Sequence, residues 1–129
     1  MLENVARVLV FLMVLLQGFY AIYSFADPTG FAALRGTDLA VFEDSDWVRI
    51  YGSRTLFVSL IIGYLLYIRN YKILIYGALF GTVMPITDAY LAFEAEAQSK
   101  VVIKHVVTVV YLLITAMVLK TLVNQKNVA

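Results

Sequence analysis

The stretch that decides the fold is residues 5–25, VARVLVFLMVLLQGFYAIYSF, in which Arg7 is the only charged residue. An α-helix rises about 1.5 Å per residue, so about 20 apolar residues cross a hydrocarbon core of about 30 Å. We therefore expect a first transmembrane helix here. A cleavable signal peptide is the alternative, because Arg7 precedes an apolar run. The run is long, however, and no Ala-x-Ala-type cleavage site follows it.

The composition of the whole chain agrees with a membrane protein. Of the 129 residues, 62% are hydrophobic, and the mean hydropathy is +0.84. A soluble domain usually contains roughly 45–50% apolar residues, so this chain is too apolar for that class. Four helices of about 20 residues with short loops use nearly the whole length. We expect a single integral membrane domain over residues 1–129.

Three further apolar segments complete the predicted bundle, at residues 47–68, 71–93 and 100–122. Arg69 and Asn70 leave room for only a tight turn, and short connections make consecutive spans antiparallel neighbours. The predicted fold is therefore an all-α, up-down-up-down bundle of four transmembrane helices. Small residues that let helix backbones approach closely are Gly52, Ser53, Ser59, Gly63, Gly77 and Gly81.

Residues 26–46 form the one long connection in the chain. Turn formers and acidic residues dominate it, which places it in water. Inside it, the apolar residues 31–34 indicate a short helix at the membrane surface, with Asp27 or Thr29 as its N-cap and Pro28 near its start.

The basic residues predict how the bundle is oriented. One end carries Arg7, Arg69, Lys72, Lys120 and Lys126, and the other carries Arg35, Arg49 and Lys100. Because loops rich in lysine and arginine stay in the cytoplasm, both termini should be cytoplasmic and the long loop should lie outside. The expected location is the cell (inner) membrane.

Three ionisable residues lie inside the predicted spans, where each charge costs about 2.5–3.5 kcal/mol at a helix centre. They are Arg54, Asp88 and His105. The third span runs opposite to the second and fourth, so the helical rise places all three roughly 8–9 Å below the outer interface. We therefore expect them to meet. The predicted ligand-binding residues are Arg54, Asp88, His105, Gln17, Tyr20 and Tyr51.

Three interpretations of this cluster stay open. Arg54 and Asp88 could form a buried ion pair that fixes helix packing, with His105 hydrogen-bonded to it and Gln17 tying in the first helix. The same charges could line an outer cavity for a polar or amphipathic ligand. His105 and Asp88 could also act as general base and orienting group, while Arg54 stabilises negative charge. No nucleophile accompanies them, so no catalytic residue is assigned.

Pro85 lies in the third span, one turn before Asp88. A proline frees the carbonyl four residues earlier, here that of Gly81, and kinks the helix. The kink either shapes helix packing or widens the outer end of the bundle around Asp88. Thr82, beside Gly81, makes such bending easier.

Other chemistries have little support in this sequence. The chain has no cysteine, which removes disulfides, thiolate catalysis and thiolate-bound clusters. One histidine and one intramembrane carboxylate do not supply the three or four ligands of a stable metal site, and His105 offers haem only one axial ligand. We therefore expect no metal and no cofactor. The sequence contains no block of basic residues interleaved with aromatics, so it does not predict nucleic acid as a partner.

The segment Gly52-Ser53-Arg54-Thr55-Leu56, followed by Pro85, Asp88 and His105, resembles small four-helix membrane proteins of bacteria and fungi. These proteins form domain-of-unknown-function families that are distantly similar to DoxX-like proteins. The resemblance covers nearly the whole chain and implies the same topology. It also implies that Arg54 and Asp88 correspond to a second-span arginine and a third-span acidic residue of those families. Without a cysteine, the thiol chemistry of DoxX-like neighbours does not transfer.

Four functions compete at this point. The first is binding of a lipid, isoprenoid or quinone headgroup in the outer pocket. The second is a small proton-coupled exporter, although the first span offers only Gln17 where an acidic residue is expected. The third is a membrane enzyme that uses His105 and Asp88 on an amphipathic substrate. The fourth is a structural subunit of a larger membrane complex. The bilayer is the expected partner, and a homo-oligomer is left open.

Overall fold

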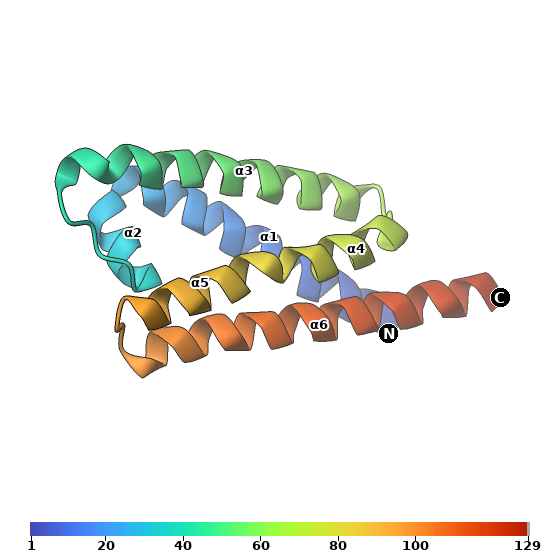
Figure 1. Cartoon of the computed structure of the whole chain (residues 1–129). Helices are drawn as coiled ribbons and strands as arrows, with labels where there is room; N and C mark the ends of the chain where they lie inside the picture. The colour runs from blue at the N-terminus through green and yellow to red at the C-terminus, as the bar shows by residue number, and fades with distance from the viewer. Residues whose placement is uncertain (129) are drawn as a thin grey trace.

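Four helical stretches of this chain are long and apolar enough to cross a bilayer, and they pack as a bundle (Figure 1). The structure is a computed structural model that describes residues 1–128. Its elements are α1 (Leu2–Ala26), α2 (Pro28–Arg35), the 3-10 turn η1 (Phe42–Asp44), α3 (Ser45–Tyr67), α4 (Tyr71–Gly81), α5 (Val83–Glu94) and α6 (Ser99–Val128). The predicted all-α four-span bundle is confirmed, and the protein is a multi-pass membrane protein.

The two ends of the bundle differ in what they carry. One end holds α2, η1 and the α5–α6 turn, and we call it the α2 end. The other holds both chain termini and the turn between α3 and α4, and we call it the terminal end (Figure 1). The predicted tight turn is present there: Arg69 has a φ of 55°, and the Asn70 side chain caps α4 by accepting from the Ile73 amide at 3.3 Å.

α1 and α3 pack closely because small residues line their contact. Gly52, Thr55 and Ser59 form the buried face of α3, at spacings that repeat with the helical turn. A Cβ added at Gly52 would overlap the Ser24 hydroxyl oxygen. Ser59 Oγ also donates a hydrogen bond to the Val14 carbonyl at 2.9 Å. The predicted role of small residues at helix contacts is therefore visible along this pair.

The terminal end is held by an apolar core and by one carboxylate. The core consists of Ala6, Val10, Tyr71, Leu74, Leu119 and Leu122. Glu3 accepts a hydrogen bond from the Tyr71 hydroxyl at 2.7 Å and lies 2.9 Å from Lys126 Nζ. These contacts join the start of α1, the start of α4 and the last turns of α6. They need α6 to run past residue 122, where we expected the fourth span to end.

The third stretch is interrupted at Thr82, between α4 and α5. Pro85 has no amide hydrogen to donate to the Gly81 carbonyl, so a break in the hydrogen-bond ladder is expected there. At the break, the amide and the hydroxyl of Thr82 both donate to the Leu79 carbonyl, at 3.3 and 2.7 Å. The predicted effect of Pro85 on the helix is confirmed, and it divides the stretch near its middle.

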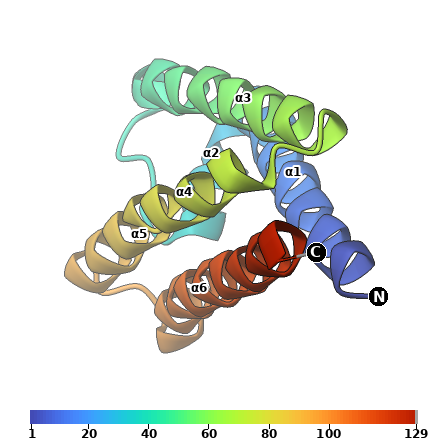
Figure 2. The same cartoon turned by 90° about the vertical axis from the view of Figure 1, so that its right-hand side faces the viewer.

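α3 stands apart from α5 and α6 in the described residues (Figure 2). α1 packs against α3 and α6, whereas α4 and α5 pack mainly along α6. The helices of the bundle are therefore not packed evenly against one another, and α3 is joined to the α4–α5 stretch mainly through α4. Outward-facing apolar side chains are largely exposed, as lipid contact requires: examples are Ile22 at 71%, Met117 at 69% and Leu60 at 64%.

α2 folds back over the bundle. Asp27 caps it by accepting from the Gly30 amide at 2.9 Å, and Pro28 is its first residue, as predicted. Gly36 ends it in the left-handed conformation, with φ 84°, which glycine adopts without a side-chain clash. Phe31 is only 1% exposed, and α2 contacts both α1 and α3, so α2 is buried more deeply than a helix that simply lies on a surface.

We predict that the α1–α3 contact is sensitive to one methyl group. Gly52→Ala should lower the free energy of unfolding by about 1–3 kcal/mol, because the new Cβ meets the buried Ser24 side chain. Gly77→Ala is the matched control, because nothing lies within 4 Å of its added Cβ and alanine favours helix. Thermal unfolding in detergent measures both. Equal stability of the two variants would contradict the close packing at Gly52.

Candidate functional site

An ion pair between Arg35 and Asp88 lies at the α2 end of the bundle. Arg35 is the last residue of α2, and Asp88 lies on α5; Arg35 Nη2 donates to Asp88 Oδ1. Their side chains are 18% and 11% exposed. The pair therefore joins the folded-back loop to the third membrane stretch in an environment that is largely closed to solvent.

His105 on α6 completes the same cluster. Its Nε2 lies 3.1 Å from the Arg35 carbonyl oxygen, and its Nδ1 lies 3.9 Å from Asp88 Oδ2. A carbonyl oxygen only accepts hydrogen bonds, so Nε2 carries the hydrogen in this arrangement. The residue is 4% exposed. Both ring nitrogens thus face groups of the protein, and neither is presented to an open space as a general base would be.

Two aromatic rings pack near the Arg35 guanidinium. It lies 4.1 Å from the centre of the Tyr51 ring and 5.9 Å from that of Phe31, distances at which a cation is attracted to a ring face. Tyr20 packs edge-on against Phe31, with ring centres 5.5 Å apart. Arg35, Asp88, His105, Tyr51 and Tyr20 therefore form one cluster, which we call the Arg35 cluster.

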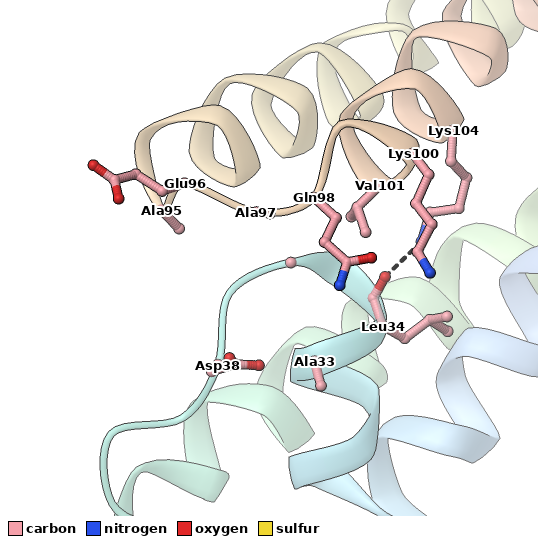
Figure 3. A pocket seen from close by; sticks show the side chains of 11 residues that line it. Ala33, Leu34, Asp38, Ala95, Glu96, Ala97, Gln98, Lys100, Val101 and Lys104 are labelled. Atoms are coloured by element: carbon pink, nitrogen blue, oxygen red, sulfur yellow. Dashed lines mark hydrogen bonds between the residues drawn. The ribbon is translucent and has the colours of Figure 1, made fainter.

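Lys104 holds the last turn of α2 from the side of α6. Its Nζ donates to the Leu34 carbonyl at 2.6 Å, where the C-terminal end of a helix favours a cation. Figure 3 shows Lys100 and Lys104 extending toward this turn, while Glu96 points away from it. A groove of about 870 Å³ lies between the end of α2 and the α5–α6 turn. Lys104, which lines this groove, already caps the C-terminal end of α2.

The predicted pairing of Arg54 with Asp88 is wrong, because Arg35 occupies that position. Arg54 is exposed and makes no ion pair within residues 1–128. The helical rise gave Arg54 the right depth, but its angle around α3 differs from that of the buried face formed by Gly52 and Thr55. Its predicted role in ligand binding stays a prediction.

Gln17 also departs from its predicted place. Its residue is 6% exposed, yet Oε1 has no hydrogen-bond partner among the described atoms. It does not tie α1 to the Arg35 cluster, as we had expected. Instead it lies on the wall of a second cavity, of about 440 Å³, to which α1, α3, α4, α5 and α6 all contribute. We call this cavity the cleft.

The cleft lies at the level of the break in the third stretch. Gly77 and Gly81 line it from α4, and Pro85 from α5, so small or ring-closed residues leave space there. Every side chain that lines it is uncharged. Its polar side chains include Thr108 and Thr115, whose hydroxyls donate to carbonyls of α6 itself, at 3.0 and 2.9 Å.

Residues 13–119 match the family described as "Domain of unknown function (DUF4267)". The chain belongs to the DUF4267 family. The match runs from α1 to the last third of α6, so it includes the Arg35 cluster and every residue that lines the cleft except Val10. No curated protein and no solved structure matches the chain. The expected domain-of-unknown-function membership is confirmed, whereas the likeness to DoxX-like proteins stays a prediction.

Two features of this DUF4267 chain were missed by reasoning from its sequence. Arg35 was assigned to the loop, although Phe31 and Arg35 are spaced i and i+4 and must share one face of the short helix. This spacing could have predicted the position of Arg35, because a helix that buries Phe31 also turns Arg35 toward the interior. The cleft had a weaker signal, namely Gly77, Gly81 and Pro85 on one stretch.

We predict that Asp88 in this DUF4267 member depends on Arg35 and not on Arg54. Arg35→Gln should lower the free energy of unfolding by about 3–5 kcal/mol, because it leaves a largely buried carboxylate without its cation. Arg54→Gln, an identical change at an exposed arginine, should cost less than about 0.5 kcal/mol. Thermal unfolding in detergent compares them, and the pairing is incorrect if Arg54→Gln proves the more damaging.

A double variant separates the charge from the packing. Arg35→Met combined with Asp88→Leu replaces the pair by apolar side chains, which often costs little or nothing. We expect it to recover most of the stability lost in Arg35→Gln.

Proposed function

We propose that this multi-pass membrane protein binds a lipid-like, amphipathic molecule in the cleft. The observation that carries the proposal is a cavity of about 440 Å³ with a wholly uncharged lining, to which Gln17, a residue whose buried amide oxygen has no partner among the described residues, contributes. Its volume lies within the roughly 300–1,000 Å³ typical of small-molecule sites. An uncharged, mostly apolar lining with a few polar side chains suits a ligand that is mostly apolar and carries a polar group.

The arrangement of helices supports entry from the bilayer. α3 packs along α1, and among α4, α5 and α6 its main contact is with α4. On the α3 side, the cleft is therefore not closed by continuous packing of one helix against another. A ligand that is already dissolved in the membrane can enter between them without crossing water. The Arg35 cluster lies toward the α2 end, where its charged groups pair with one another.

The competing functions are less well supported by the same geometry. An exporter driven by protons needs an accessible carboxylate in the membrane, whereas Asp88 is engaged by Arg35 and is 11% exposed. An enzyme that uses His105 as a base needs a free ring nitrogen, and both nitrogens face protein groups. A structural subunit needs no cavity, so it is the outcome to expect if the cleft binds nothing.

We predict that filling the cleft abolishes labelling by a lipid probe. Gly77→Leu places a side chain in open space on the cleft wall. It should therefore remove most photolabelling by diazirine-bearing hexadecanol in lipid nanodiscs. The labelled peptides, identified by mass spectrometry, should come from the stretches that line the cleft in the parent protein.

The control for this experiment enlarges a side chain outside the cleft. Val107 is 59% exposed on α6 and does not line the cavity, so Val107→Leu should label like the parent. Uniform labelling of all outward-facing surfaces, unaffected by Gly77→Leu, would mean that the probe dissolves in lipid and that the cleft is no binding site.

We also propose that both termini are cytoplasmic and that the α2 end faces outward. The support is the excess of lysine and arginine at the terminal end, including Arg69, Lys72 and Lys120. Because the chain has no cysteine, single cysteines report position without background. In intact cells, Asp38→Cys should react with a membrane-impermeant maleimide, whereas Gln125→Cys should react only after permeabilisation. The reverse pattern would invert the proposed orientation.

A further inference from the structure

The depth of Gln17 restricts what the ligand can be. In α1, Gln17 lies nine residues before Ala26, which is about 13 Å of helix, so it is near the middle of the span. Thr108 lies nine residues after the start of α6 and lines the cleft at a comparable depth. The unmatched polar group of the cleft is therefore far from either membrane surface.

A charged or strongly polar headgroup does not fit at this depth. Moving it from the interface to the middle of the hydrocarbon core costs several kcal/mol or more, and the uncharged lining supplies no counter-ion. Phospholipids and ionised fatty acids keep their headgroups at the interface for this reason. The ligand that fits carries a small, neutral polar group that can enter the core at modest cost.

The unmatched atom also selects the kind of polar group. Gln17 Oε1 is an acceptor without a donor in the described chain. The hydroxyls of Thr108 and Thr115 donate to carbonyls of their own helix, and the hydroxyl of Tyr76, which also lines the cleft, makes no bond to it. A ligand with a donor can supply the missing hydrogen bond. Oε1 is covered by protein, so the amide must turn about its last torsion to meet the ligand, and this torsion is soft. A hydroxyl, which donates and accepts, can pair with the amide in either orientation.

We infer that the ligand of the cleft is an uncharged lipid alcohol whose hydroxyl donates to the Gln17 side chain while its chain fills the apolar part. This inference rests on the proposed function and adds the chemical class of the ligand to it. It also assigns a role to the Gln17 amide oxygen, which accepts no hydrogen bond within residues 1–128.

The test uses three probes of equal chain length: hexadecanol, its methyl ether and palmitate. The ether keeps the oxygen but loses the donor, and palmitate carries a charge. Native mass spectrometry of the detergent-solubilised protein measures the fraction bound to each. We expect hexadecanol to bind about tenfold more tightly than the ether, as the loss of a donor to a buried acceptor implies, and palmitate to bind most weakly.

Gln17→Leu is the decisive variant, and Gln125→Leu, the same change at an exposed position of α6, is its control. Gln17→Leu should reduce the affinity for hexadecanol about tenfold and make alcohol and ether equivalent. Without probe it should be at least as heat-stable as the parent, because it removes a buried polar atom that has no partner. A variant that fails to fold would show that Gln17 is structural and would overturn the inference.

The other outcomes separate this inference from the proposed function. If all three probes bind equally and Gln17→Leu changes nothing, the cleft takes any apolar chain, so the alcohol is wrong while lipid binding stands. If alcohol and ether bind equally and both depend on Gln17, the amide nitrogen makes the contact, and the donor assignment is wrong. If no probe binds and Gly77→Leu has no effect on labelling, both the inference and the proposed function fail.

Discussion

The ion pair between Arg35 and Asp88 is the interaction on which the α2 end of this protein depends. A charge in a membrane-spanning stretch is costly unless it is paired, and Asp88 finds its cation on a loop that must fold back to bring it there. The helix cap at Asp27, the left-handed Gly36 and the buried Phe31 all serve that return path. The cation of Asp88 comes from α2 and not from a neighbouring span. The α2 end of the bundle therefore closes only when α2 is folded.

Each of the two regions of the bundle leaves one buried polar atom without a hydrogen-bond partner among the described residues. In the Arg35 cluster, the guanidinium pairs with the Asp88 carboxylate and packs against Tyr51. The His105 imidazole donates to the Arg35 carbonyl oxygen. Arg35 Nε, however, is buried and has no partner in the described chain. On the cleft wall, Gln17 Oε1 has no partner in the described chain. Native proteins rarely leave a buried acceptor unmatched, so an unmatched one beside a cavity points to a partner from outside the chain. Of the two residues with an unpartnered buried atom, only the neutral glutamine lines the cleft, although the ionisable residues drew attention in the sequence.

The fold could be predicted from the sequence because it follows from length and hydropathy, whereas the site depended on angles that these do not give. The span boundaries, the Asp27 cap and the break near Pro85 are local properties of the chain. The partner of Asp88 is not. Depth along a helix placed Arg54 and Asp88 together, but only rotation about the helix axis decides which side chain faces inward. The return of α2 is a tertiary contact, and no local pattern states where a loop will dock.

The break in the third stretch at Thr82 is one reason why the cleft exists. A continuous helix of ordinary residues would allow α4 and α5 to pack evenly against α3, as the α1–α3 pair does through Gly52 and Ser59. Pro85 removes one ladder hydrogen bond, and Gly77 and Gly81 remove the side chains that would fill the space. Glycines usually let helices approach, as at Gly52, yet nothing lies within 4 Å of a Cβ at Gly77. The same residue type closes one helix contact and leaves the other open, so space in the cleft is a property of how α3 is placed and not of composition alone.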